Sequence, residues 1–244
     1  MALGGGDMGV ADKVVVVTGA TGHLGPVVAR VFAAEGARLA LMARNQSALA
    51  QAVLDLNLPP ERCLAVPADL SDPTQAESGA KTVLDHFGRA DVLLCLAGGY
   101  LPGAPVADLT LADLQAMLSI NLFTAFNAAH AFLPHLSANG WGRLIAISSL
   151  YGQQPAARTA AYAAAKAALE ALVLAIAQEG KSKGLTANLL IVRTIDSPEA
   201  RKAAPKANTA AWTSPEEMAY TMLFLCTEEA GAINGARIPL YGRG

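Results

Sequence analysis

Charged residues are scarce in this sequence, and neither sign of charge predominates. The 244 residues include 18 lysines and arginines against 20 aspartates and glutamates, which leaves a net charge of −2. Nucleic-acid binding requires a basic face. The composition therefore argues against a nucleic-acid partner.

Cysteine is also rare, and the chain lacks the apolar segments that direct proteins to membranes. Cys63, Cys95 and Cys226 lie far apart and form no CxxC pair, which excludes a disulfide framework and zinc-type spacing. The start, "MALGGGDMGVADK", has no apolar signal-peptide core, and no uncharged apolar run reaches about 18 residues. We expect a cytoplasmic protein with reduced, buried thiols, no metal and no membrane span.

Short apolar runs alternate with helical patterns along the whole chain, and 53% of the residues are hydrophobic. Such alternation predicts a parallel sheet whose helices cover both faces, because continuous apolar strands are buried on both sides. The fold class is α/β: a single doubly wound (Rossmann) domain with about seven strands. The expected strands are 13–19, 38–44, 63–70, 91–99, 142–149, 186–192 and 236–240, and the clearest helices are 26–37, 45–56, 109–136, 161–180 and one from 214.

We assign residues 1–10 to a flexible lead-in and residues 11–244 to this one domain. Residues 193–213 contain Pro198 and Pro205 and show no regular pattern. Irregular loops of this length are uncommon and often form lids. This segment is therefore the predicted substrate lid.

The segment "TGATGHLG" joins the first strand to the first helix. A glycine-rich turn in this position predicts dinucleotide binding, because it brings the backbone and the helix N-terminus close to the phosphates. A plain turn between strand and helix is the alternative. The candidate cofactor residues in this loop are Gly19, Thr21, Gly22, His23, Leu24 and Gly25.

The second strand ends in "MARN", where an acidic residue would favour NAD by binding the ribose hydroxyls. Arg44 stands there instead, and a guanidinium group matches a 2′-phosphate. The sequence predicts NADP(H) as the cofactor, with NAD(H) possible. An ordinary exposed arginine is the alternative.

The segment "YAAAK" places Tyr162 and Lys166 one helical turn apart on the same face. A neighbouring cation favours the phenolate and lowers the pKa of a tyrosine. The pair fits an acid–base device, although an alanine-rich helix also produces such spacing by chance.

Together with "DLSD", "LLCLAGG", "SINLF" and "ISS", these motifs resemble the short-chain dehydrogenase/reductase family over about residues 11–242. The resemblance implies four catalytic residues: Tyr162 as proton donor, Lys166 lowering its pKa and binding ribose hydroxyls, Ser149 orienting the carbonyl, and Asn121 holding a water. Ser148 is an alternative to Ser149. Further cofactor contacts implied by the family are Asp69, Leu70, Ala97, Gly98, Thr194 and Ile195.

Four segments depart from the family pattern. His23 replaces a glycine, "CLAG" replaces "NNAG", Val192–Arg193 replaces "PG", and the chain ends in "LYGRG". Local segments also resemble dihydropteridine reductase, but the general layout is closer to 3-oxoacyl-carrier-protein reductases. The expected activity is NADPH-dependent reduction of a small-molecule carbonyl, either a ketone or a 3-oxoacyl thioester. The alternatives are a pterin or imine reductase and a non-catalytic dinucleotide sensor.

The substrate side is the least defined part of the prediction. Aromatic and cationic residues near the expected site are candidate pocket residues, and a basic group in the lid suits an acidic substrate. A solvated surface is the alternative for that group. Family resemblance implies a homotetramer or dimer paired through the helices that carry Asn121 and Tyr162. The candidate pocket residues are Tyr100, Tyr151, Arg193 and Trp212, and the basic lid group is Arg201, Lys202 and Lys206.

Overall fold

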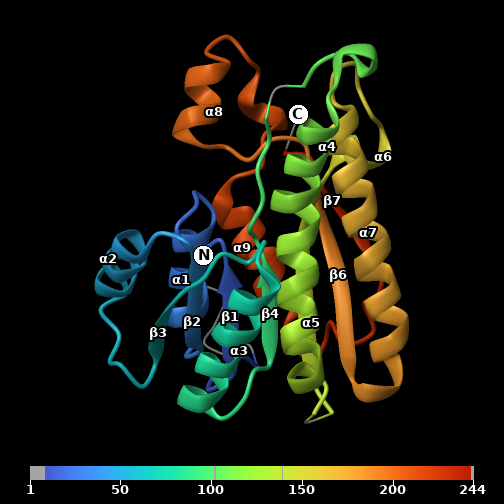
Figure 1. Ribbon diagram of the computed structural model, residues 1–244. Helices are drawn as coiled ribbons and strands as arrows, with labels where there is room; N and C mark the ends of the chain where they lie inside the picture. Colours follow the sequence, from blue (N-terminus) through green and yellow to red (C-terminus); the bar gives the residue numbers. More distant parts are fainter. Residues whose placement is uncertain (1–8, 102, 139, 243–244) are drawn as a thin grey trace.

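Seven parallel strands form the single sheet of the described chain in a computed structural model, which describes residues 9–101, 103–138 and 140–242 (Figure 1). The order is β3-β2-β1-β4-β5-β6-β7, and every neighbouring pair is parallel. The predicted doubly wound fold is confirmed. The strands are β1 (Val14–Thr18), β2 (Arg38–Ala43), β3 (Cys63–Pro67), β4 (Val92–Cys95), β5 (Gly142–Ser149), β6 (Leu185–Val192) and β7 (Arg237–Leu240).

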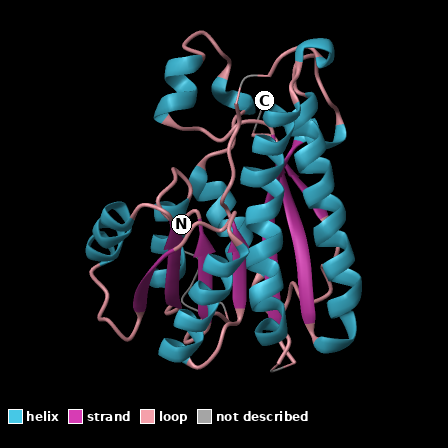
Figure 2. Ribbon diagram, in the orientation of Figure 1, coloured by secondary structure: helices cyan, strands magenta, loops and turns pink. Residues whose placement is uncertain are grey.

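Helices cover both faces of this sheet, as Figure 2 shows. One apolar core packs α3, α5 and α7 against one face, and a second core packs α1, α2 and α9 against the other. Alternate residues of β1 divide between the two cores: Val14 and Val16 join the first, and Val15 and Val17 the second. The helices are α1 (Gly25–Ala34), α2 (Gln46–Leu56), α3 (Pro73–Phe87), α4 (Leu111–Leu118), α5 (Thr124–Leu136), α6 (Leu150–Gln153), α7 (Ala160–Gly180), α8 (Pro198–Ala203) and α9 (Pro215–Leu225).

Two segments differ from the expected pattern. The helix expected over 109–136 is divided, because a π-helical turn, Ser119–Phe123, separates α4 from α5. The lid is not irregular: Ser197 caps α8 by accepting from the Ala200 amide, and a short 3-10 helix, Thr209–Ala211, follows. Ser197 before Pro198 is an ordinary helix start.

The N-terminal boundary is also earlier than the sequence indicated. Val10 is fully buried in the second core, so the packed domain includes the last residue assigned to the lead-in. Of the other residues of the predicted lead-in, Gly9 is described, whereas residues 1–8 lie outside the described residues.

Two helical stretches are long and apolar enough to cross a membrane by length and composition, Leu111–Leu136 and Ala160–Lys183. Parts of both stretches belong to the core of this domain: α5 contacts β4, and α7 contacts β5 and β6. Core helices also pass this test of length and composition. Packing against the sheet therefore accounts for the apolar character of these two stretches.

Candidate active site

The glycine loop lies where the sheet order reverses, between β1 and β4. Gly19 has φ +65°, and a Cβ there would come within 2.8 Å of the Ala97 nitrogen. A Cβ on Gly25 would lie 2.4 Å from the Ala20 carbonyl oxygen. Because these two glycines have no Cβ, the loop, the first helix and the end of β4 can approach one another closely. A larger residue at either position would collide with the backbone.

The N-terminus of α1 remains open to an anion. Leu24 is its N-cap, and no side chain of the described residues caps this helix. The first turn of α1 also carries no acidic residue. Uncapped amides and the positive end of the helix dipole are suited to bind phosphate groups.

A cavity of about 410 Å³ lies beside this loop and is lined from the ends of four strands. Its wall includes Gly19 and Gly22 after β1, Arg44 after β2, and Asp69 after β3. The backbone of Leu96–Gly99 after β4 completes it. A crevice at the carboxyl ends of the strands, where the order reverses, is the usual dinucleotide site of such folds, and the chemistry of these residues fits that group. Of the predicted cofactor residues, the cavity contains Gly19, Thr21, Gly22, Arg44, Asp69, Leu70, Ala97 and Gly98.

A neighbouring cavity of about 210 Å³ extends the same site toward the lid. It is lined by His23, Leu24 and Gly25 from the glycine loop and by Ile195 from the lid. Thr194 is not among its lining residues; its carbonyl oxygen accepts from the Thr213 amide. The lid therefore reaches the glycine loop through Ile195 rather than through Thr194.

Asp69 and Arg44 are the two charged residues in the wall of the larger cavity, within the described part of the chain. The Asp69 carboxylate accepts hydrogen bonds from the Ser71 hydroxyl (2.7 Å) and amide (3.0 Å). These bonds lower the pKa of Asp69, and the nearby charge of Arg44 lowers it further. Arg44 itself is exposed and forms no ion pair within the described part of the chain, so its guanidinium group is available to a ligand.

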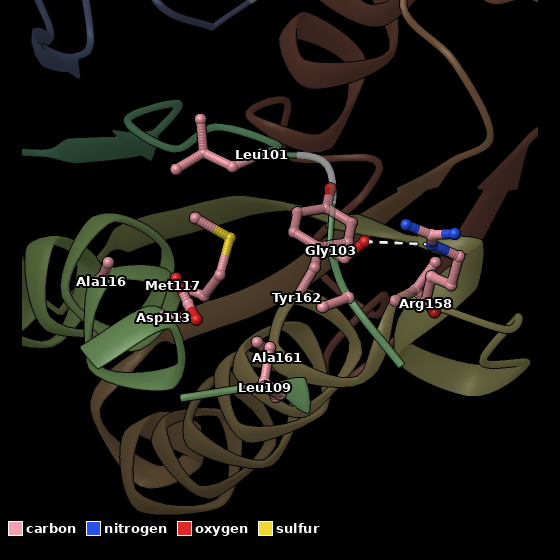
Figure 3. A pocket seen from close by; sticks show the side chains of 11 residues that line it. Leu101, Gly103, Leu109, Asp113, Ala116, Met117, Arg158, Ala161 and Tyr162 are labelled. Atoms are coloured by element: carbon pink, nitrogen blue, oxygen red, sulfur yellow. Dashed lines mark hydrogen bonds between the residues drawn. The ribbon is translucent and has the colours of Figure 1, made fainter. Parts of the chain in front are cut away.

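Tyr162 lies in the first turn of α7, at the wall of a third cavity of about 300 Å³ (Figure 3). Burial raises the pKa of Tyr162, and a hydrogen bond with Ser149 acts in the opposite direction. Tyr100 and Tyr151 add to the increase. The phenol pKa is thus raised here, whereas the sequence predicted that a neighbouring cation lowers it. A raised pKa leaves the phenol protonated at neutral pH, as an ordinary tyrosine is, but makes it a weaker acid than the sequence predicted.

Lys166 is buried one turn beyond Tyr162. Its Nζ donates to the Ile147 carbonyl oxygen (2.9 Å) and lies 5.8 Å from the centre of the Tyr162 ring. Burial lowers the pKa of Lys166 to about 8, and the charge of Glu170 opposes that shift. The lysine therefore keeps most of its charge at pH 7.

The two adjacent serines of β5 have different partners. Ser149 lies close enough to Tyr162 to lower the pKa of that phenol, and its Oγ accepts from the Tyr151 amide (3.2 Å). The Ser148 hydroxyl donates to Glu170 Oε1 (2.7 Å). Ser149, and not Ser148, is the hydroxyl that accompanies Tyr162.

Asn121 occupies the π-helical turn and is fully buried. Its Nδ2 donates to the carbonyl oxygens of Gly99 (2.9 Å) and Met117 (3.2 Å), and its Oδ1 accepts from the Gly99 amide (3.1 Å). A Cβ on Gly98 would lie 2.9 Å from Asn121 Oδ1 and 3.5 Å from Lys166 Nζ. Asn121 therefore holds the loop after β4 beside Lys166, a contact that the expected water-binding role did not include.

The four candidate substrate residues separate into two pairs. The rings of Tyr100 and Tyr151 lie edge-on to Tyr162, with centroids 5.1 and 6.4 Å from its own. Arg193 instead lies over Tyr241, with its guanidinium carbon 5.6 Å from that ring's centre. Trp212 follows the short 3-10 helix of the lid. None of the four residues is among the lining residues of the three cavities described above.

The basic lid group is smaller than the sequence indicated. Arg201 forms a two-pronged ion pair with Asp196, with both N–O distances 2.6 Å. This pairing neutralises one of the three expected cations and leaves Lys202 and Lys206 exposed. The lid is also bound to the glycine loop, since His23 Nε2 lies 2.7 Å from Glu199 Oε2.

Sequence reasoning missed several residues of the site. Thr18 joins β1 to the loop after β4, because its Oγ1 donates to the Leu94 carbonyl and accepts from the Leu96 amide (3.1 Å). Glu170 lies four residues after Lys166, at the same spacing that identified the Tyr162 pair, and that spacing would have revealed it. Arg158 and Met117 line the cavity beside Tyr162, but no motif pointed to them.

Comparisons with known proteins agree with this geometry. A family model described as short chain dehydrogenase matches residues 13–208. The cis-4-hydroxycyclohexanecarboxylate dehydrogenase of Sinomonas cyclohexanicum is 30% identical, with 95% of this chain and 96% of that protein covered. The NAD(+) 2-dehydro-3-deoxy-L-rhamnonate dehydrogenase of a Sphingomonas strain is 30% identical, covering 77% and 74%.

A solved structure shows the same architecture. The L-sorbose reductase of Gluconobacter frateurii, complexed with NADPH and L-sorbose, superimposes with a TM-score of 0.87. It is 27% identical and covers 98% of both chains. The likeness therefore extends over nearly the whole of both chains.

Proposed function

Because this chain belongs to the short-chain dehydrogenase family, we propose that it is an NADPH-preferring reductase of a small-molecule carbonyl group. One observation carries the proposal: Tyr162, Ser149 and Lys166 converge beside a glycine-lined cavity at the reversal of the sheet order. Oxidoreductase activity and a nicotinamide cofactor are common to the family as a whole. The direction, the substrate and the preference for NADPH are specific to this proposal.

A bound nicotinamide cofactor supplies the hydride in this chemistry. Gly19, Gly22 and the open start of α1 would hold its phosphates, and Arg44 would bind the 2′-phosphate. Lys166 would present an ammonium group to the ribose hydroxyls. Asn121 fixes the loop after β4, beside which the cofactor would lie.

The reacting carbonyl meets two hydroxyl groups of this chain. Ser149 would donate to the carbonyl oxygen and orient it, and Tyr162 would give that oxygen its proton. Lys166, buried beneath, stabilises the phenolate that remains. Solvent then returns a proton to Tyr162.

The cavity of about 300 Å³ beside Tyr162 is the proposed substrate subsite. Figure 3 shows Leu101, Met117 and Tyr162 around it, and Leu109 and Ala161 add to its apolar wall. Asp113 and Arg158 add two charged side chains to the same wall. The lining therefore favours a substrate with a compact apolar body that also carries a polar group, such as a substituted ketone.

Reduction of a ketone panel with NADPH, followed by the loss of nicotinamide absorbance, tests the proposal. The panel includes cyclic and simple ketones, diketones, 3-oxoacyl thioesters, imines and a quinonoid pterin. We expect turnover to fall by about two to four orders of magnitude in Tyr162→Phe, since a general acid contributes that much. Tyr151→Phe is the matched control, because its ring only flanks Tyr162, and it should lose far less.

The alternatives give different results in the same experiment. Turnover confined to imines or the pterin would replace the proposed substrate class with the second one. NADPH binding without turnover of any substrate would favour the dinucleotide sensor. Equal activity of Tyr162→Phe and the unmodified protein would contradict the acid–base role.

A further inference from the structure

Glu170 is a buried carboxylate directly behind the proposed site, and the proposed reaction gives it no part. Its side chain is 3% exposed. Three elements donate hydrogen bonds to it: Ser148 from β5 (2.7 Å), Gln153 from α6 (3.2 Å) and Arg237 from β7 (2.6 Å). A buried carboxylate with a full set of donors is costly to assemble, so its position calls for an explanation.

Glu170 completes a row of three contacts between α7 and the end of β5. Ser149 lies beside Tyr162 and lowers its pKa, the carbonyl of Ile147 accepts from Lys166, and Ser148 donates to Glu170. Three consecutive strand residues are thus held by three residues spaced one helical turn apart. The contact of Glu170 fixes the strand on which Ser149 must meet Tyr162.

The short helix α6 packs closely against this row. A Cβ on Gly152 would lie 2.9 Å from Glu170 Oε1 and 3.2 Å from the Lys166 Cβ. The absence of a side chain at Gly152 therefore lets the turn after Ser149 lie directly on the carboxylate. The carboxylate is enclosed by protein, which strengthens its field at Lys166.

We propose that Glu170 is a positioning residue, which fixes Ser149 through Ser148 and keeps Lys166 charged through its own negative charge. Glu170 stands one turn beyond Lys166 on the same face, and the two form no direct ion pair within the described residues. Their coupling is therefore through space. The role of this charge in catalysis rests on the function proposed above. The effect of the charge on Lys166 does not depend on that function.

Within the described residues, few other charged or titratable groups are placed near Lys166. On its own helix these groups are Tyr162 and Glu170. The phenols of Tyr100 and Tyr151 flank Tyr162, and Arg237 of β7 is paired with Glu170. The opposing influences on the lysine are burial, which lowers its pKa, and Glu170, which raises it. Removal of the Glu170 charge should therefore lower the pKa of Lys166 below about 8.

The test measures the pKa of Lys166 directly in the cofactor-free protein by NMR titration of labelled lysine side chains. Lys166→Met identifies the signal. We expect Glu170→Gln to lower this pKa by about half a unit or more, since the lost charge is close and shielded from water. Ser148→Ala is the matched control: it removes one bond to the carboxylate but no charge, and it should leave the pKa unchanged.

Arg237→Met should change the pKa of Lys166 in the opposite direction, and the Arg237 side chain is 43% exposed. The substitution removes a positive charge that lies 2.6 Å from the carboxylate, while Ser148 and Gln153 still donate to that carboxylate, so the pKa of Lys166 should rise. This variant keeps the proposal testable if Glu170→Gln does not fold. An unchanged pKa of Lys166 in the folded variants would overturn the proposal.

Activity provides a separate readout. If the chain reduces carbonyls, the alkaline limb of kcat/KM should move to lower pH in Glu170→Gln and return toward its original position in Glu170→Asp. A purely structural role would lower activity at every pH without moving that limb, and this result would count against the proposal. Failure to find any turnover would reject the proposed function but leave the NMR result standing.

Discussion

At the scale of single residues, the site depends on where a few polar groups meet an otherwise apolar interior. Thr18, Asn121 and Glu170 each bind backbone or side chains of a different element. Each of these residues positions another group that faces the cavities. Their removal would therefore disturb chemistry at a distance, through the loop or strand that each one holds.

The preference for NADPH is expected to depend on Arg44. Arg44→Ala should lower kcat/KM for NADPH by about 10- to 100-fold, because a hydrogen bond to a charged group contributes about 1.5–3 kcal/mol. The value for NADH should change little. Arg30→Ala is the matched control, since Arg30 is an exposed arginine of α1 that lines a different groove.

Steady-state kinetics with both cofactors decide this point. If the unmodified protein uses NADH better than NADPH, Arg44 does not act as proposed. An equal loss in Arg44→Ala for both cofactors would mean that the arginine supports the fold of the loop instead.

At the scale of elements, two short segments matter more than their length suggests. The π-helical turn Ser119–Phe123 divides one long helix and directs Asn121 toward Gly99; such turns often occur at functional sites. Helix α8 lies beyond the carboxyl ends of the strands, on the side where the cavities open (Figure 1). Glu199 of this helix contacts His23 of the glycine loop, and this contact connects the lid to the cavity beside that loop.

We expect the contact of Glu199 with His23 to slow cofactor release. Both side chains are largely exposed, at 67% and 54%, and exposed pairs contribute little. Glu199→Ala should therefore raise the NADPH release rate by only about two- to fivefold. Stopped-flow displacement of NADPH measures that rate.

Lys202→Ala is the control for this prediction, because Lys202 belongs to the same helix and is exposed. Its release rate should equal that of the unmodified protein. The same variant examines the steering hypothesis: if the KM of an acidic substrate responds neither to Lys202→Ala nor to salt, the lid does not attract that substrate.

At the scale of the whole molecule, the helices on one face of the sheet remain partly uncovered. Phe123 and Phe126 are 43% and 48% exposed. With Leu122 and Leu172 they line a shallow apolar groove between α5 and α7. Contiguous apolar patches of this kind are typical of protein interfaces.

We therefore expect a homodimer or homotetramer paired through this face. Light scattering should give a mass of two or four times 25.1 kDa. Phe126→Glu should reduce the mass, because it places a charge in the interface, whereas the same change at Leu54, which is exposed on α2, should not. A monomeric mass for the unmodified protein would refute the prediction.

Much of this molecule follows from the sequence alone. The seven apolar runs became seven parallel strands, because strands buried on both faces need continuous apolar residues. The glycine loop and the pair of Tyr162 and Lys166 were recognisable because their function depends on local spacing. Local spacing is written directly in the sequence.

The tertiary structure alone decided the rest. It separated Ser149 from Ser148, brought Tyr100 to Tyr162 and left Arg193 over Tyr241. It also raised the pKa of Tyr162, where spacing had suggested a decrease, because burial depends on every element packed around the phenol. Contacts between residues far apart in the chain are set by the packing of whole elements, and that packing has no local signature in the sequence.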